Sequence, residues 1–296
     1  MSALLDIADL HFAIGGTPVL RGVSLQVGSA CIVGLVGESG AGKSMVGRVI
    51  LGLEPDGGHV TGGSVRYDGR DLVALAGRAR HALLGREIAL IPQNPMTALN
   101  PVARIEPQIT DVLRQHLGLD ASAARTRALE LLESVHIREP ERVLRQFPHE
   151  LSGGMRQRIL IAIAFACRPR LVVADEPTTA LDVTVQRQIL RLLKELQAAH
   201  GTAVLFITHD LGVVAKICDE VAVMHSGRIL ESGTTADLFR NPVHAYTRAL
   251  FAAMPRHDRP DAVPAPIPDA LSQQLIAEAQ AVDASRHSKM ISEFSR

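Results

Sequence analysis

The segment from Gly37 to Ser44 has the residue types and spacing needed to bind a triphosphate. It reads GESGAGKS and matches the pattern GxxxxGK[ST], placed between a short apolar run and a helical pattern. In this pattern the glycines let backbone N–H groups and a helix N-terminus point at phosphate, the lysine reaches the β- and γ-phosphates, and the hydroxyl binds Mg²⁺. The alternative is a tight turn without a ligand. The residues predicted to bind nucleotide here are Gly37, Glu38, Ser39, Gly40, Ala41, Gly42, Lys43 and Ser44.

A second candidate is the acidic pair Asp175–Glu176, which follows the apolar residues Leu171 to Ala174. Open α/β sheets bind ligands at such strand ends. Asp175 would hold Mg²⁺, directly or through water, and Glu176 would orient and polarise the attacking water. Alone, an acidic pair after a strand is more often a helix cap or a solvated turn. Together with Gly37 to Ser44 it predicts phosphoryl-transfer chemistry.

The segment Leu151 to Arg158 reads LSGGMRQR and predicts a second anion site. Ser152, Gly153 and Gly154 open a helix whose first amides lack helical partners, and Arg156 and Arg158 would add positive charge. Because one chain then carries two phosphate-seeking segments, one inference is a site completed between two subunits. The alternative is an N-capped core helix.

Buried strands must position these residues. Short apolar runs predict strands at 31–36, 88–91, 171–174, 203–207 and 221–224, which favours a mostly parallel α/β core. The interval of about 94–168 is helical in composition and predicts an inserted helical subdomain. An apolar face spaced from Val185 to Leu196 predicts a helix packed on the sheet.

The predicted domain organisation is an ATPase domain over 1–254 and a tail over 255–296. Five prolines between Pro255 and Pro268 mark an extended linker. The apolar residues Leu271, Leu275, Ile276 and Ala279 allow an amphipathic helix in the tail. We expect these last residues to be frayed or disordered instead.

Composition excludes several classes of protein. Hydrophobic residues make up 47% and charged residues 21%, as in a folded globular chain, and the formal net charge of +0 gives no sign of nucleic-acid binding. The longest apolar run, 159–167, is about half of what a membrane span needs. The N-terminus does not resemble a signal peptide. Cys31, Cys167 and Cys218 lack the spacing of a disulfide framework, a zinc site or an iron–sulfur centre, and we expect them to be buried apolar residues.

The order of these motifs resembles that of an ABC transporter nucleotide-binding subunit. The resembling segments are VGESGAGKS, LSGGMRQR, LVVADEP, TALD ending at Asp182, and ITHD ending at Asp210. Longer segments, among them ADEPTTALDVTVQ, look like the peptide/nickel branch. The resemblance implies a P-loop NTPase (RecA-like) ABC domain with an inserted helical subdomain and an N-terminal antiparallel β subdomain. Asn241 to Thr247 resembles a C-terminal element of the branch, with Ala245 in place of its proline.

The resemblance also implies a role for each matching residue. Gln93 would contact Mg²⁺ and the attacking water, His209 would contact the γ-phosphate, and Asp182 would lie at a dimer seam. Their plainer alternatives are a polar residue at a strand end, a structural histidine and a helix N-cap. Phe12 would stack on adenine, with a core phenylalanine as the alternative and His11 as the rival.

The implied function is that of an ATPase subunit, using ATP and Mg²⁺, of a bacterial importer of di- or oligopeptides. A nickel or metal-chelate importer of the same branch is the first alternative. A soluble ABC protein acting on ribosomes or DNA, and a P-loop small-molecule kinase, are rivals from other classes. The implied partners are two transmembrane permease subunits, a second ATP-binding subunit that is a paralogue or a copy, and indirectly an extracytoplasmic solute-binding protein, with no nucleic acid. The implied location is the cytoplasmic face of the inner membrane, as a peripheral subunit.

Overall fold

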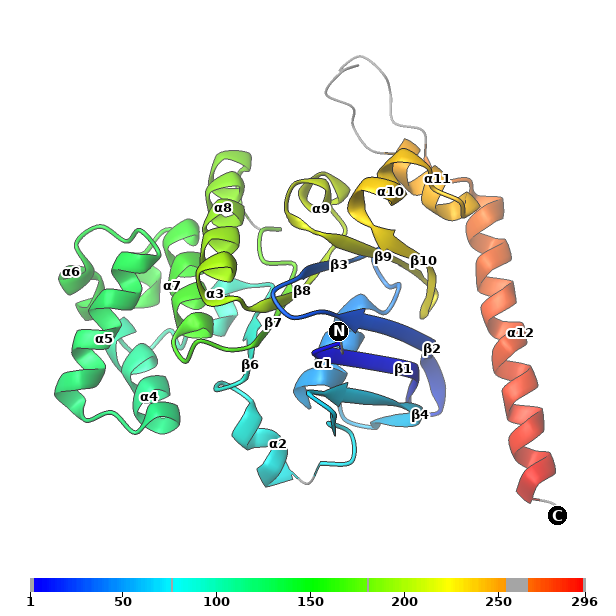
Figure 1. Cartoon of the computed structure of the whole chain (residues 1–296), viewed down its shortest axis with the longest axis horizontal. Coiled ribbons are helices and arrows are strands. Elements are labelled where there is room, and N and C mark those ends of the chain that lie inside the picture. The colour runs from blue at the N-terminus through cyan, green and yellow to red at the C-terminus, as the bar shows by residue number, and fades with distance from the viewer. Residues whose placement is uncertain (1–2, 76, 180, 254–265, 295–296) are drawn as a thin grey trace. The chain divides into compact units, whose positions relative to one another are not determined.

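The computed structural model describes residues 3–75, 77–179, 181–253 and 266–294 (Figure 1). The chain divides into two compact units. Unit 1 contains Met1–Gly28, Ile32–Leu75 and Ile207–Arg296, and unit 2 contains Ser29–Cys31 and Ala76–Phe206. The proline-rich linker predicted at 255–268 lies largely outside the described residues, which omit 254–265.

Unit 1 contains an antiparallel sheet of four strands in the order β2-β1-β4-β5. In β1 the side chains of Leu5, Ile7, Leu10 and Phe12 are buried, which gives the sheet one apolar face. The strands are β1 (Leu5–Ile14), β2 (Thr17–Val27), β4 (Gly58–Tyr67) and β5 (Arg70–Asp71). This sheet is the N-terminal antiparallel β subdomain that the family resemblance implied.

Unit 1 also carries the strand and helix that flank the glycine-rich segment. β3 (Ile32–Val36) is buried along its whole length and pairs in parallel with β9 (Glu220–His225), which pairs antiparallel with β10 (Arg228–Thr234). The helix α1 (Lys43–Leu51) follows β3 and ends at Gly52, which has a left-handed backbone. The other short helices of unit 1 are α9 (Leu211–Ile217), α10 (Thr235–Arg240) and α11 (Ala245–Ala252).

The C-terminal residues form a long helix, α12 (Asp269–Phe294), drawn in red in Figure 1. The prediction of a frayed or disordered tail was therefore wrong for these residues. Leu275 and Ala279, one turn apart, are buried, and Asp283 accepts a hydrogen bond of 2.9 Å from Nε of Arg21 in β2. The tail's own apolar pattern is weak, so the helix depends on packing against the rest of unit 1, which local sequence does not reveal.

Unit 2 contains the strands β8-β7-β6 in that order: β6 (Ile88–Ile91), β7 (Leu171–Asp175) and β8 (Ala203–Thr208, ending in unit 1). The helix α8 (Val183–His200) precedes β8 and buries the face that carries Ile189, Leu193 and Leu196. All five strands predicted from apolar runs are thus confirmed, as β3, β6, β7, β8 and β9.

Helices fill the rest of unit 2 (Figure 1). Between β6 and β7, the elements α4, α5 and α6 contact one another, and α7 contacts α5 and α8. The helices are α2 (Gly77–Leu83), α3 (Pro95–Ala98), α4 (Ile105–Leu117), α5 (Ala121–Ser134), α6 (Pro140–Arg145), the 3₁₀ turn η1 (Pro148–Glu150) and α7 (Gly153–Phe165). Within the described residues, none of the helices has the length and apolar character of a membrane span. Cys218 is buried as expected, whereas Cys31 and Cys167 are half-buried.

Candidate functional site

The glycine-rich segment makes a tight passage from β3 to α1 that only glycine allows at several positions. A Cβ atom on Gly37 would lie 2.0 Å from the carbonyl oxygen of Met224, and Gly40 and Gly42 have φ angles of 82° and 103°. Gly42 is the N-cap of α1, so the segment runs directly into a helix N-terminus. This is the backbone arrangement that binds phosphate in such loops.

Lys43 folds back into this loop. Its Nζ donates hydrogen bonds to the carbonyl oxygens of Gly37 (2.9 Å) and Glu38 (2.8 Å), and the side chain is only 5% exposed. A buried ammonium is tolerated because these oxygens bind it. Phosphate oxygens are stronger acceptors for the same group, so the structure holds the lysine charge where a triphosphate could bind it.

Unit 2 brings Gln93 and Glu176 together. Nε2 of Gln93 donates to Oε2 of Glu176 at 3.0 Å. The pairing register explains this contact. Ile91 of β6 lies opposite Ala174 of β7, and Gln93 and Glu176 each come two residues after one of them. Asp175, half-buried, ends β7 itself.

The Glu176 carboxylate is further fixed by its own turn. Oγ1 of Thr179 donates to the same Oε2 at 2.9 Å, and the backbone of Glu176 has a φ of 46°. A left-handed backbone at a non-glycine residue costs about 1–3 kcal/mol and often marks a functional turn. Sequence reasoning did not assign Thr179, although it lies in the quoted segment ADEPTTALD.

Ser152 caps α7 as predicted from its type, with Oγ accepting a hydrogen bond of 3.3 Å from the backbone N–H of Met155. Gly154 permits a close approach of α8, because a Cβ atom there would lie 2.8 Å from Cγ1 of Val185. The N-terminus of α7 is thus a capped helix tip with Ser152 and Gly153 exposed.

The expectation that Arg156 and Arg158 add charge to this helix tip is corrected by their contacts. Nε of Arg156, a buried residue, donates to the carbonyl oxygen of Pro148 at 2.6 Å, and its Nη1 contacts Sδ of Met96. Arg158 donates to the carbonyl oxygen of Val135 at 2.7 Å. Both guanidinium groups therefore anchor α7 to neighbouring segments of unit 2.

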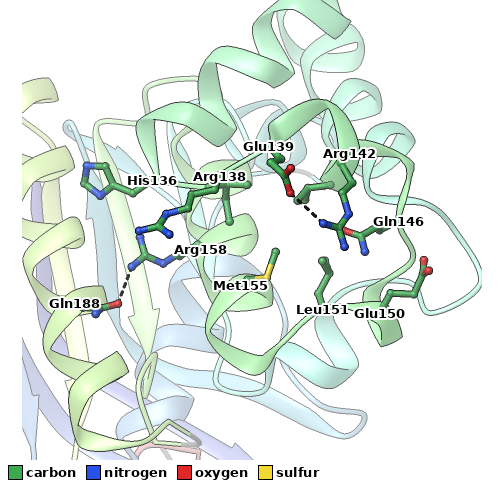
Figure 2. Close-up of a pocket in the computed structure, with 12 residues that line it drawn as sticks. His136, Arg138, Glu139, Arg142, Gln146, Glu150, Leu151, Met155, Arg158 and Gln188 are labelled. Carbon is green, nitrogen blue, oxygen red and sulfur yellow. Dashed lines mark hydrogen bonds and ion pairs between the residues drawn. The ribbon is translucent and has the colours of Figure 1, made fainter.

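Arg158 also lines a cavity of about 610 Å³ within unit 2, between the α5–α6 connection, α6, α7 and α8 (Figure 2). Its Nη2 donates to Oε1 of Gln188 at 3.0 Å, and burial lowers the pKa of its guanidinium. On another wall Arg142 donates to Glu139 at 3.0 Å. The hydrogen bonds to Val135 and Gln188 therefore account for the direction in which Arg158 points.

Two further predicted residues occupy positions that fit their plainer alternatives. Asp182 is the N-cap of α8, accepting hydrogen bonds from the backbone N–H groups of Thr184 (3.0 Å) and Val185 (2.9 Å). His209 is exposed and follows β8 directly. Their roles at a dimer seam and at the γ-phosphate remain predictions.

The prediction that Phe12 stacks on adenine is corrected by its burial. The ring is 0% exposed, and a Cβ atom on Gly58 would lie 2.6 Å from its Cζ. Phe12 therefore packs in the core, as its alternative proposed. The rival His11 is half-buried, and its Nε2 lies 3.2 Å from Oδ1 of Asp9.

The sequence was compared with protein families. The profile described as "ABC transporter" matches residues 20–179, more than half of the chain. The chain belongs to this family. A second profile, described as "Oligopeptide/dipeptide transporter, C-terminal region", matches residues 230–276. The predicted ABC-type ATPase is confirmed, and the rival of a P-loop small-molecule kinase is excluded.

Individual relatives of this ABC protein agree with the family. The probable D,D-dipeptide transport ATP-binding protein DdpD of Escherichia coli is 46% identical over 275 residues, 90% of this chain and 84% of the relative. The oligopeptide transport ATP-binding protein OppD of Bacillus subtilis is 47% identical over 260 residues, 86% of this chain and 73% of the relative.

A solved structure of an ATP-binding cassette, MJ0796, described as dimeric, in a post-hydrolysis state and bound to ADP and Pi, has a similar fold. The TM-score is 0.69 at 26% identity, covering 78% of this chain and 98% of that one. The predicted ABC nucleotide-binding fold is confirmed.

Proposed function

We propose that this ABC protein is the ATP-hydrolysing subunit of a bacterial peptide importer. The observation that carries the proposal is the presence of two profiles in one chain, the ABC transporter profile over 20–179 and the peptide-transporter C-terminal profile over 230–276. The names of the relatives, which refer to dipeptide and oligopeptide transport, support peptides over nickel as the cargo.

In the proposed site, Gly37 to Ser44 bind the triphosphate of ATP. Lys43 exchanges its two carbonyl partners for phosphate oxygens. Glu176 orients the attacking water, and its hydrogen bonds to Gln93 and Thr179 set the direction of its carboxylate. Because phosphoryl transfer depends mainly on positioning and charge, a carboxylate fixed in this way fits the role. His209 would contact the γ-phosphate.

The residues proposed for Mg²⁺ fit its chemistry. Ser44, Asp175 and Gln93 offer hydroxyl, carboxylate and amide oxygens, the hard ligands that Mg²⁺ prefers. Among the residues that the structure describes, no group of three His, Cys, Asp or Glu residues could hold a metal by itself. Mg²⁺ would therefore bind together with the nucleotide phosphates, and when bound it would neutralise charge on them.

A second cassette would complete the site. The tip of α7, formed by Ser152, Gly153 and Gly154, would bind the γ-phosphate of ATP held by the other cassette, and Asp182 would lie at the seam. The capped helix N-terminus supports this role because its backbone dipole favours anions. The MJ0796 cassette is described as dimeric, which also supports a paired state.

Two permease subunits would place the chain on the cytoplasmic face of the inner membrane. The segment from Gln93 to Arg104 is proposed to contact them, and it exposes two large apolar side chains, Met96 (60% exposed) and Val102 (83% exposed). Large apolar side chains exposed within one short segment favour a protein contact there. An extracytoplasmic solute-binding protein would deliver the cargo without touching this chain.

Purification of the tagged full-length chain from detergent-solubilised membranes tests the proposal. Two multi-spanning proteins should co-purify, and after reconstitution in liposomes di- or oligopeptides should stimulate ATP hydrolysis in the presence of the binding protein. The Lys43→Ala variant, which loses charge-assisted contacts to phosphate, should lose ATP binding. Alanine at Lys194, an exposed lysine of α8, is the matched control and should bind ATP normally.

Three results would contradict the proposal. Recovery with ribosomes or DNA and with no multi-spanning protein would favour a soluble ABC protein. Stimulation by Ni²⁺ and not by peptides would replace the proposed cargo. Unchanged ATP affinity in the Lys43→Ala variant would remove Gly37 to Ser44 from the nucleotide site.

A further inference from the structure

A side chain from the C-terminal region reaches the glycine-rich loop. The hydroxyl of Tyr246, the second residue of α11, donates to Oε2 of Glu38 at 3.2 Å and accepts a hydrogen bond of 3.4 Å from the backbone N–H of Glu38. Nε2 of His225 lies 3.7 Å from the same Oε2. All these residues belong to unit 1.

The position of Tyr246 is set by its own surroundings and not by Glu38. The side chain is 0% exposed, and its ring lies edge-on to His225 with centroids 4.7 Å apart. The backbone before it is fixed to β10, because the Glu231 carboxylate accepts hydrogen bonds from the N–H groups of Val243 (2.7 Å) and His244 (3.0 Å). The phenol is thus a rigid support on which a loop residue can rest.

Burial raises the pKa of Tyr246, with the Glu38 charge acting in the same direction. The hydroxyl therefore keeps its proton and remains a donor to the carboxylate. The connection between β9 and β10 contacts the loop a few residues further on, where the N–H of Gly227 donates to the carbonyl oxygen of Ala41 at 2.9 Å. Two points of the loop are thus held by residues that follow β9 in sequence.

Glu38 is an unfavourable residue in a loop that must accept a triphosphate. Its side chain is 45% exposed, and its carboxylate carries the same sign of charge as the ligand. A hydrogen bond from a rigid donor restricts the directions that this carboxylate can take. The two hydrogen bonds of the Tyr246 hydroxyl also fix the position of Glu38 at the start of the loop.

We infer that Tyr246 is a positioning residue of the phosphate loop, holding Glu38 so that the loop is already shaped for ATP. The inference rests on the proposed nucleotide site at Gly37 to Ser44. It assigns to the C-terminal region, which the peptide-transporter profile covers, a direct effect on the affinity for ATP.

Tyr246→Phe in the full-length chain tests the inference because it removes only the hydroxyl. ATP affinity should fall about three- to tenfold, as expected for one hydrogen bond to a partly exposed charged group. The KM for ATP should rise while kcat stays within about twofold, because Tyr246 does not touch the reacting atoms. The matched control is Tyr67→Phe, which alters the other buried tyrosine, at the end of β4, and should leave the affinity unchanged.

A double-mutant cycle with Glu38→Ala separates positioning from a general loss of structure. In the Glu38→Ala background, Tyr246→Phe should change the ATP affinity less than twofold, because the carboxylate that it holds is gone. An equal loss in both backgrounds, or a loss matched by Tyr67→Phe, would show a purely structural role and overturn the inference.

The two proposals fail in distinguishable ways. A wild-type chain that binds no ATP would overturn the proposed nucleotide site. A wild-type chain that binds ATP with the same affinity as Tyr246→Phe would overturn the positioning role alone.

Discussion

Glu176 shows how the local backbone prepares a side chain for chemistry. Its φ of 46° turns the chain away from β7, and its Oε2 accepts from both Gln93 and Thr179. Two donors on one oxygen restrict the direction in which the Glu176 carboxylate points. The strain at this residue is stored where the proposed reaction needs a defined direction.

Replacing Glu176 with glutamine should therefore separate binding from turnover. The amide keeps the size of the side chain but cannot accept a proton from water, so ATP hydrolysis should fall by about 10²–10⁴-fold. ATP affinity should stay within a few-fold of wild type, as measured by equilibrium binding. Wild-type hydrolysis in this variant would remove Glu176 from its role.

At the scale of elements, the contact between α7 and α8 depends on a missing side chain. Alanine at Gly154 would place its Cβ 2.8 Å from Cγ1 of Val185, a stiff β-branched side chain. At Gly153, one residue earlier, the nearest atom is Cδ2 of Leu181 at 3.8 Å, an ordinary contact. Gly153→Ala can therefore serve as the control for Gly154→Ala.

Gly154→Ala should lower the free energy of unfolding by about 1–3 kcal/mol in chemical denaturation, whereas Gly153→Ala should leave it nearly unchanged. In a chain that already carries Val185→Ala, adding Gly154→Ala should lower the free energy of unfolding much less than it does in the wild-type chain, because the clashing methyl group is gone. If Gly153→Ala is the more costly change, or if Val185→Ala gives no recovery, the proposed helix contact is wrong.

His225, the last residue of β9, should make the free energy of unfolding depend on pH. Burial lowers the pKa of His225 below its ordinary value of 6.5, although the Glu38 charge opposes this. Below about pH 6.5 the unfolded chain then binds more protons at this residue than the folded chain, so stability falls as the pH falls.

His225→Gln should flatten this dependence. Between pH 7 and pH 5 the variant should lose less unfolding free energy than wild type does, because it lacks the group whose pKa is lowered on folding. Denaturant titrations at several pH values give the comparison. A variant that loses more stability on acidification than wild type would reverse the assigned sign.

The sequence allowed the buried strands and the ligand-facing loops to be predicted because their signals are local. β3 is apolar throughout and β7 is apolar up to Asp175, and Gly37 to Ser44 carry their backbone requirements in their residue types. Contacts between distant segments could not be predicted. Phe12 is enclosed through its packing against Gly58, and α12 depends on Arg21 of β2, 262 residues before Asp283.

The same limit applies to the support of the loop by Tyr246. The segment from Asn241 to Thr247 resembled a family element, but only the folded chain shows its tyrosine on Glu38, 208 residues away. The segment from Asn241 to Thr247 matched a family element but had no part in the proposed catalytic steps. That mismatch is the signal that could have pointed to Tyr246.

At the scale of the whole molecule, each compact unit carries one part of the proposed chemistry. Unit 1 holds the phosphate loop and His209, and unit 2 holds Glu176 and the capped tip of α7. We propose that this tip binds the ATP of a second cassette. ATP should therefore act as a ligand that favours the paired state, to the extent that it binds that state more tightly.

Sedimentation of the Glu176→Gln chain with ATP and Mg²⁺ tests this claim most directly, with the chain alone and mixed with its second ATP-binding subunit. ATP should drive association, ADP should not, and a further Ser152→Glu change should prevent association while the single chain still binds ATP. If the chain binds ATP but stays monomeric in both samples, or associates equally well with Ser152→Glu, the account is contradicted.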